Sequence, residues 1–259
     1  MSASPAGSAG ADVLRALHLD RPAGRPLVLP GPWDAASARV FEEAGFPALA
    51  TPSAGIDAAL GNPDGTTRPE EMLAAVARIA RAVSVPVSAD LEDGYGLPAE
   101  ELVARVLETG AVGLNLEDSD RSGHRLRDPR EQAERLAAVR AAAGPALFVN
   151  ARVDTYLHGG TAEEAAERAV LYRAAGADCV FPVLAPPADL PRLRAAGVEG
   201  PLNFLARPGD PSCAELGALG ATRITFGPGL LRRTLAHLAG LAAGLTAGPA
   251  TVPAPGPAA

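Results

Sequence analysis

Short apolar runs alternate with longer amphipathic segments along most of the chain. Eight of the apolar runs are five or six residues long, and their aliphatic and β-branched residues are typical of buried strands. These runs lie at residues 26–30, 48–52, 86–90, 112–117, 146–150, 179–183, 201–205 and 222–226. We therefore expect a chain built from repeated strand-helix units.

Amphipathic segments that are typical of helices follow the predicted strands. They lie at residues 35–44, 69–82, 98–109, 129–143, 161–175, 187–196, 211–219 and 228–243. Two of them open with helix-start signals, since Asp128 precedes Pro129 and Thr161 stands three residues before Glu164. Eight strand-helix units in succession predict an α/β fold of the (β/α)8 TIM-barrel type, with a doubly wound sheet as the alternative.

A single barrel domain over residues 11–246 accounts for all the predicted elements. The 259 residues are 47% hydrophobic, which is enough apolar material for one large core. Residues 1–10 and the Pro/Ala-rich tail 247–259 are expected to be disordered, because they offer little apolar surface to bury.

Charge and residue types exclude several function classes. The formal net charge of −7 and the lack of a basic block argue against nucleic-acid or membrane partners. All 23 basic residues are arginine, so no lysine can form a Schiff base or complete a Walker A loop. Cys179 and Cys213 lack metal-site spacing, and no signal peptide or membrane span is recognisable. We expect a cytoplasmic protein.

Acidic residues stand where several predicted strands end. The stretch "SADLEDGYG" (88–96) carries Asp90 and Glu92 after the third strand, Glu117 ends the fourth, and Asp64 follows the second. In a (β/α)8 barrel these ends meet at one mouth, where crowded carboxylates need a cation. Oxygen ligands favour Mg²⁺ or Mn²⁺. Asp90 is the expected direct ligand, Glu92 and Glu117 bind directly or through water, and Asp64 lies in the outer shell.

Each of these residues also has a purely structural interpretation. Strand-end acids can simply cap the next helix, and Arg152 can form an ion pair with Asp154 or Glu117 across the mouth. The co-occurrence of the acids favours a metal site, and Arg152 is expected to bind a substrate carboxylate. Tyr95 either lines the pocket or packs under its loop. His158 is expected to be a loop residue.

Four stretches together resemble the isocitrate lyase/phosphoenolpyruvate mutase superfamily. They are "SADLEDGYG", "GLNLEDS", "FVNARVD" and "TPSAGIDAALGNPDG", and the resemblance spans roughly residues 26–232. It implies a modified barrel of the phosphoenolpyruvate/pyruvate-domain type that binds Mg²⁺ and a 2-oxo or 2-hydroxy acid. The family's metal-site acids fall on Asp90, Glu92 and Glu117, its early-loop acid on Asp64, and its carboxylate-binding arginine on Arg152.

The chain departs from the family pattern in two places. The segment that supplies amides to the substrate carboxylate begins with Pro52 instead of serine, which leaves the amides of Ser53 and Ala54. The lid after the fourth strand, "DSDRSGHRLRDP", has neither the cysteine nor the lysine of the known lyases and mutases. His124 and Arg125 are therefore the remaining candidates in the lid, and His124 is able to shuttle a proton near neutral pH. Asn203, in the seventh strand, is a further expected substrate-binding residue.

The resulting hypothesis is a Mg²⁺-dependent carbon–carbon lyase or decarboxylase. A small 2-oxo or 2-hydroxy carboxylic acid would react through a metal-stabilised pyruvate-type enolate, with Arg152, His124 and Tyr95 as catalytic residues. Phosphonate P–C chemistry and a non-catalytic carboxylate-binding relative are the alternatives. Because the family exchanges a C-terminal helix, the resemblance also implies a homo-oligomer, a dimer or tetramer, formed through "LLRRTLAHLAGLAAGL".

Overall fold

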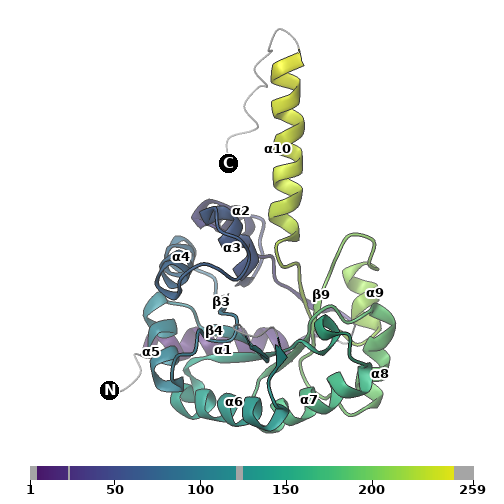
Figure 1. The fold of residues 1–259 in the computed structure, drawn as a ribbon. Helices are drawn as coiled ribbons and strands as arrows, with labels where there is room; N and C mark the ends of the chain where they lie inside the picture. The colour runs from purple at the N-terminus through teal and green to yellow at the C-terminus, as the bar shows by residue number, and fades with distance from the viewer. Residues whose placement is uncertain (1–4, 23, 121–124, 248–259) are drawn as a thin grey trace.

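The computed structural model describes residues 5–22, 24–120 and 125–247 (Figure 1). Its main strands form two parallel sheets, one ordered β2-β3-β4-β7-β8 and the other β1-β10-β9. Their bounds are β1 Leu27–Val28, β2 Leu49–Ala50, β3 Val87–Asp90, β4 Gly113–Glu117, β7 Phe148–Val153, β8 Cys179–Pro182, β9 Asn203–Leu205 and β10 Arg223–Thr225.

Two contacts close these sheets into one ring. Val180 in β8 forms a parallel bridge with Leu202, directly before β9. On the other side, the Ala50 N–H in β2 donates to the Pro30 carbonyl, just beyond β1, at 3.1 Å. The eight strands therefore form a closed parallel barrel, which confirms the predicted fold and removes the doubly wound alternative.

The helices that follow the strands surround the barrel (Figure 1). The capping signals act as predicted, since the Asp128 side chain accepts the Arg130 N–H, and Thr161 and Glu164 form a capping box. The helices are α2 Ala35–Glu43, α4 Pro69–Ala82, α5 Ala99–Thr109, α6 Pro129–Ala143, α7 Ala162–Ala174, α8 Leu190–Ala195, α9 Cys213–Ala218 and α10 Gly229–Ala247.

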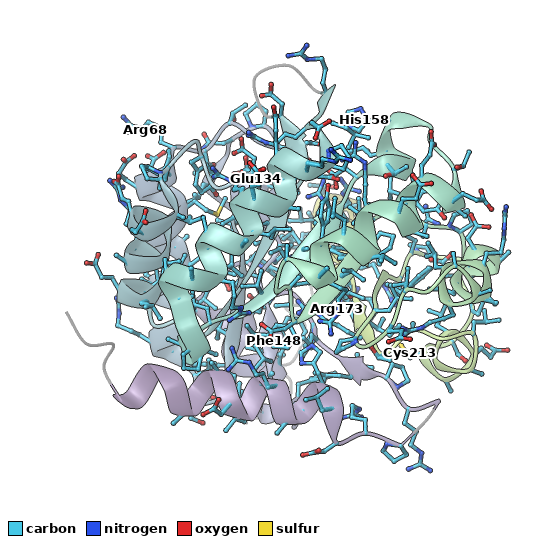
Figure 2. The ribbon with its side chains drawn as sticks, turned by 90° about the horizontal axis from the view of Figure 1, so that it is seen from below. Arg68, Glu134, Phe148, His158, Arg173 and Cys213 are labelled. Atoms are coloured by element: carbon cyan, nitrogen blue, oxygen red, sulfur yellow. The ribbon has the colours of Figure 1, made fainter. Side chains whose placement is uncertain are left out.

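An additional helix, α1 (Pro5–Leu19), closes the end of the barrel where the strands begin. Leu14 is fully buried, and the His18 ring stacks on Phe148 with the ring centroids 4.1 Å apart. Figure 2 shows Phe148 beside α1. The sequence analysis placed residues 1–10 outside the ordered domain, whereas α1 begins at Pro5. Residues 1–4 and 248–259 lie outside the described part of the chain.

Further elements that the sequence pattern did not predict are inserted into the connections between the strands. Helix α3 (Ser53–Leu60) follows β2, and a hairpin of β5 (Ser119–Asp120) and β6 (Arg125–Leu126) follows β4. Three short 3₁₀ turns are η1 Gly144–Ala146, η2 Thr155–His158 and η3 Pro187–Asp189. All except η1 follow a strand, so they shape the carboxyl end of the barrel.

Helix α10 extends away from the barrel (Figure 1). Leu231 near its start is buried, but beyond it Leu235, Leu238, Leu241 and Leu245 are 45 to 56% exposed. These leucines recur every three or four residues and therefore form one apolar face of the helix. No helix in the described ranges combines the length and the apolar character needed to cross a membrane.

Candidate active site

The carboxyl ends of the strands surround a cavity of about 920 Å³. Most of the residues that the sequence analysis selected for the site line this cavity, although they come from four different strand-helix connections. They are Ser53, Ala54, Asp64, Asp90, Glu92, Glu117 and Arg152. The barrel therefore brings the predicted acids and the predicted arginine into one space, as the convergence of parallel strands requires.

Three other selected residues are not part of this lining. Asn203 is buried inside the barrel, where its Oδ1 accepts a hydrogen bond from the Thr225 hydroxyl at 3.2 Å. Tyr95 is half-buried and packs against the apolar layer between strands and helices. His124 lies outside the described residues. The structure thus separates Asn203 and Tyr95 from the cavity.

Asp90, the last residue of β3, is held by one of its two carboxylate oxygens. Oδ2 accepts hydrogen bonds from the Ser53 hydroxyl at 2.9 Å and from the Ser53 N–H at 3.2 Å. Oδ1 is buried and has no hydrogen-bond partner among the described residues. The Ser53 amide, expected to bind substrate, is therefore engaged with Asp90, while the second oxygen of Asp90 is available for a cation.

The loop after β3 stores backbone strain. Glu92 and Tyr95 adopt positive φ angles of 52° and 58°, a conformation that costs a non-glycine residue about 1 kcal/mol. Asp93 holds the loop, because its carboxylate accepts the Tyr95 N–H and an Arg127 Nη2–H, each at 2.8 Å. A side chain at Gly94 would lie 3.0 Å from Leu102. Buried Glu92 is thus fixed at the cavity.

Arg152 lies between two carboxylates. Its Nε and Nη2 groups donate to the two oxygens of Asp154, at 2.6 and 3.1 Å, and Nη1 forms an ion pair with Glu117. Glu117 and Arg152 are register partners on β4 and β7, so their side chains share one face. A guanidinium has five N–H groups, which leaves one on Nη1 and one on Nη2 for a further acceptor.

Asp118 illustrates how strand alternation selects the site residues. It follows Glu117 but points away from the cavity, and it is fully buried. There it accepts the Asp154 N–H at 2.8 Å, the Tyr172 hydroxyl at 2.8 Å and Arg168 at 3.0 Å. Asp118 therefore positions the segment that carries Asp154, and Glu117 is the cavity-facing member of the pair.

The electrostatics of the cavity favour a bound cation. Burial raises the pKa of Glu117 to about 9; the charges of Asp154, Asp90 and Glu92 add to this increase, and Arg152 opposes it. Burial and the charge of Asp90 also raise the pKa of the Asp64 carboxyl. The pKa of Arg152 is raised, because its carboxylate neighbours outweigh its burial. A divalent ion would relieve this repulsion.

The donor set fits Mg²⁺ or Mn²⁺ held by few protein ligands. Within the described ranges, no three His, Cys, Asp or Glu side chains are arranged as a preformed metal cluster. Mg²⁺ is usually held by one or two carboxylates and completed by water. The buried Oδ1 of Asp90 suits direct ligation, and Glu92 and Glu117 line the same cavity and suit contact through water.

His158 and Ser119, which the sequence analysis did not select for the site, also line the cavity. The Ser119 hydroxyl donates to Asp154 Oδ2 at 2.6 Å and lies 3.1 Å from His158 Nε2. A hydroxyl has one proton to donate, so His158 must donate its Nε2–H to Ser119. His158, Ser119 and Asp154 thus form one hydrogen-bonded row, a chain of side chains that ends at Arg152.

Comparison with known proteins places the chain in a family. Residues 14–246 match the family model described as "Phosphoenolpyruvate phosphomutase". An uncharacterized protein of Mycobacterium tuberculosis is 37% identical over 208 residues, which cover 79% of this chain and 78% of that protein.

Other relatives carry functional names. A 2-methylisocitrate lyase of Halalkalibacterium halodurans is 32% identical over 186 residues, covering 68% of this chain and 61% of the lyase. The crystal structure of a phosphoenolpyruvate phosphomutase from Streptomyces platensis subsp. rosaceus superposes with a TM-score of 0.83 at 28% identity, covering 92% of this chain and 87% of that one.

Proposed function

The chain belongs to the phosphoenolpyruvate phosphomutase family, within the isocitrate lyase/phosphoenolpyruvate mutase superfamily, and from this premise we propose that it is a Mg²⁺-dependent carbon–carbon lyase or decarboxylase. Its substrate is a small 2-oxo or 2-hydroxy carboxylic acid. The observation that carries the proposal is the pair formed by Asp90 and Arg152 at one cavity: among the described residues, one buried oxygen of Asp90 has no partner and two N–H groups of Arg152 are uncommitted.

In this proposal each residue of the cavity has its own role. Arg152 binds the substrate carboxylate with the N–H groups that Asp154 and Glu117 leave uncommitted. Asp90 holds the cation directly, and Ser53 keeps the Asp90 side chain in place. When bound, Mg²⁺ acts as a Lewis acid that stabilises the enolate charge formed as the bond to C3 breaks.

For a 2-oxo acid, the enolate left by this cleavage must then receive a proton at C3, whereas a 2-hydroxy acid loses its hydroxyl proton as the 2-oxo acid forms and leaves the enolate on the departing fragment. Among the described residues, Ser119 and His158 offer a route, because the hydroxyl lines the cavity and the imidazole is hydrogen-bonded to it. Ser119 gives its proton to carbon and receives one from the His158 imidazolium, so histidine ends neutral and the product is a 2-oxo acid. His124, the shuttle expected from the sequence, remains a second proposed donor.

A second candidate function is phosphonate P–C bond chemistry. The family model and the Streptomyces structure carry the name of a phosphomutase, which favours this reaction class. Both reactions pass through a pyruvate-type enolate, so the same cavity residues would serve them. A panel that includes phosphonopyruvate therefore separates the two candidates.

The decisive experiment is a turnover assay with Mg²⁺ that follows pyruvate release and, for phosphonopyruvate, also the loss of the P–C bond by ³¹P NMR. The panel contains oxaloacetate, substituted malates, 2-methylisocitrate and phosphonopyruvate, and we expect turnover of one carbon–carbon substrate that disappears with EDTA. Asp90→Asn should lower kcat/KM more than about 100-fold, because even outer-shell partners of metals contribute 10–100-fold. Asp12→Asn, which removes one carboxylate from α1 at the other end of the barrel, serves as the control.

If no compound of the panel is turned over, the protein is a non-catalytic carboxylate-binding relative. This conclusion holds only if the purified protein still binds Mg²⁺, which calorimetry of wild type and of Asp90→Asn measures. EDTA-insensitive turnover would overturn the metal-dependent mechanism. Turnover of phosphonopyruvate alone would assign the second candidate function.

We further propose that the protein is a cytoplasmic homo-oligomer, a dimer or tetramer, without nucleic-acid or membrane partners. Four leucines on the exposed face of α10 support an assembly in which this helix packs on a second copy of the chain. Light scattering of wild type and of Leu238→Asp tests it, and we expect the variant to have a lower mass. Equal masses would contradict the role of α10.

A further inference from the structure

The loop after β3 has an unusual backbone conformation. Four of the five residues from 92 to 96 have positive φ angles, between 52° and 80°: Glu92, Gly94, Tyr95 and Gly96. For Glu92 and Tyr95 such angles are unfavourable, so they persist only where the surroundings fix the loop. Because Glu92 lines the cavity, the contacts that fix this loop also decide where its carboxylate lies.

The Asp93 side chain lies at the centre of these contacts. It is buried, and its two oxygens accept the Tyr95 N–H and an Arg127 Nη2–H, each at 2.8 Å. Arg135 Nη2 donates to the Asp93 carbonyl oxygen at 2.9 Å. A buried carboxylate is stable only when it is paired and hydrogen-bonded. Arg127 is thus the ion-pair partner of the residue that shapes the loop.

Arg127 reaches this loop from another part of the chain. It lies between β6 and Asp128, the N-cap of α6. Its main chain is held on both sides, since its N–H donates to the Asp118 carbonyl at 2.8 Å and its own carbonyl accepts an Arg168 Nη1–H at 3.0 Å. A fixed main chain therefore brings the guanidinium to Asp93, 34 residues away in the sequence.

The main chain of Arg127 also belongs to the support of Arg152. Arg168 donates to Asp118 Oδ2 at 3.0 Å as well, and Asp118 Oδ1 accepts the Asp154 N–H at 2.8 Å. Asp154 in turn binds the Arg152 guanidinium. Arg127 thus contacts the metal-binding loop with its side chain and the support of Arg152 with its main chain. A substitution of the side chain separates these two roles.

We infer that Arg127 is a positioning residue for the metal site: by pairing with Asp93 it keeps Glu92 at the cavity, where this carboxylate supports bound Mg²⁺. The inference rests on the proposed function and adds to it a residue that is not among those described as lining the cavity. The sign of its effect is distinctive. If Arg127 acted only as a positive charge, its removal would tighten the binding of a cation. Loss of the Glu92 position weakens that binding instead.

The double variant Asp93→Asn/Arg127→Met isolates position from charge. It removes one negative and one positive charge together, and the asparagine can still accept the Tyr95 N–H. We expect calorimetry with Mg²⁺ alone to show about tenfold weaker binding than in wild type, since outer-shell partners of metals contribute about 10–100-fold. Arg127→Met should weaken binding at least about threefold. Arg127→Lys, which keeps a donor and a charge for Asp93, should stay within about threefold of wild type.

Kinetics of the same double variant give a second readout. The Mg²⁺ concentration for half-maximal activity should rise about tenfold, whereas kcat and the substrate KM at saturating Mg²⁺ should stay within about threefold, because the support of Arg152 is intact. Lower stability alone would leave the Mg²⁺ affinity of the folded protein unchanged. Arg105→Met, which removes an arginine–carboxylate pair with Glu101 on α5, is the matched control and should change none of these values.

Two results would overturn the inference and leave the proposed function standing. One is a Mg²⁺ affinity of the double variant equal to that of wild type, and the other is tighter Mg²⁺ binding in Arg127→Met. If wild type itself binds no Mg²⁺, the proposed function fails first and the inference falls with it.

Discussion

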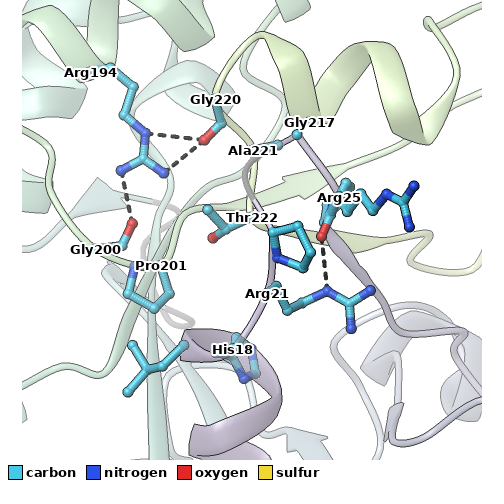
Figure 3. Close-up of a pocket in the computed structure, with 14 residues that line it drawn as sticks. His18, Arg21, Arg25, Arg194, Gly200, Pro201, Gly217, Gly220, Ala221 and Thr222 are labelled. Carbon is cyan, nitrogen blue, oxygen red and sulfur yellow. Dashed lines mark hydrogen bonds between the residues drawn. The ribbon is translucent and has the colours of Figure 1, made fainter.

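At the carboxyl ends of the strands, Glu117 and Asp154 share the guanidinium of Arg152, whereas at the amino ends arginines bind backbone carbonyls. Arg194 donates to the Gly220 carbonyl at 3.1 and 2.7 Å and to that of Gly200 at 2.8 Å (Figure 3). At the carboxyl ends, two carboxylates contact one arginine, which keeps N–H groups for a further acceptor. At the amino ends, arginines bind the carbonyls of neighbouring loops and hold these loops together.

The amino end also contains a cavity, of about 400 Å³, yet its lining differs (Figure 3). Arg21, Arg25 and Arg194 line it, and no carboxylate does so among the described residues. Nearby, Arg140 binds the carbonyls of Gly144, Leu147 and Gly176. Arg140 and Arg194 each engage four of their five N–H groups, and their bonds to carbonyls stabilise the loops.

Strain is distributed in the same unequal way. Among the described residues, the non-glycine positions with positive φ are Glu92, Tyr95 and Leu184, and all three follow the carboxyl end of a strand. Backbone strain at the described non-glycine residues therefore lies at the mouth, whereas at the amino end arginines such as Arg140 and Arg194 bind loop carbonyls. Substitutions at the mouth should therefore lower activity, whereas substitutions at the amino end should lower stability.

The largest expected effect is at Arg152. In Arg152→Lys, one ammonium group must replace a guanidinium that contacts Asp154 and Glu117 and still has donors for the substrate. We expect kcat/KM to fall about 1000-fold, with a change in the free energy of unfolding below about 2 kcal/mol. Steady-state kinetics and urea titration measure the two. Activity within tenfold of wild type would contradict the role of Arg152, and exposed Arg207→Lys is the control.

His158→Gln tests the hydrogen-bonded row at the mouth. The amide can still donate to the Ser119 hydroxyl, but it cannot carry an extra proton. We expect kcat to fall about 100-fold with KM unchanged, since positioned acids and bases contribute about 10²–10⁴-fold. The rate of deuterium incorporation at pyruvate C3 in D₂O, followed by NMR, should fall equally. An unchanged exchange rate in a folded variant would exclude His158 as the donor.

Arg140→Met tests the loops at the amino end of the barrel. The variant loses carbonyl bonds to Gly144, Leu147 and Gly176, whereas Asp178 keeps Arg15 as an ion-pair partner. We expect the free energy of unfolding to fall by at least about 2 kcal/mol, because hydrogen bonds to charged groups contribute about 1.5–3 kcal/mol each and several are lost. kcat/KM should stay within twofold. A variant with normal stability and low activity would break the comparison between the two ends.

The last prediction concerns pH and His18, which acts on stability alone. Burial, followed by the charges of Arg223 and Arg21, lowers the pKa of His18 to about 3. The unfolded chain binds this proton near pH 6.5, so stability should decline as pH falls through 6.5 toward 3, by up to about 1.4 kcal/mol per unit. His18→Phe keeps a ring against Phe148 and cannot titrate. Urea titrations at pH 6.5 and 4.5 should show a shallower decline for this variant, and identical slopes would contradict a buried neutral His18.

Much of the fold could be predicted from local signals. Helices α4 and α6 have the predicted bounds, because Pro69 and the Asp128-Pro129 pair mark their first turns. Helix α3 was missed because Pro52 precedes it without a side-chain cap, and α1 because its first turns are rich in Gly and Ala. Neither carries a start signal that can be read along the chain.

The sequence by itself determined the strand-helix order and which acids end the strands, because periodicity and capping act between residues a few positions apart. Only the tertiary structure decided that Ser53 binds Asp90 and that His158 meets Ser119, across 37 and 39 residues. It also turned Asp118 away from the cavity, although this residue directly follows Glu117 in the chain. Hydrogen bonds and van der Waals contacts act over a few ångströms, so these partners are set only when the barrel closes.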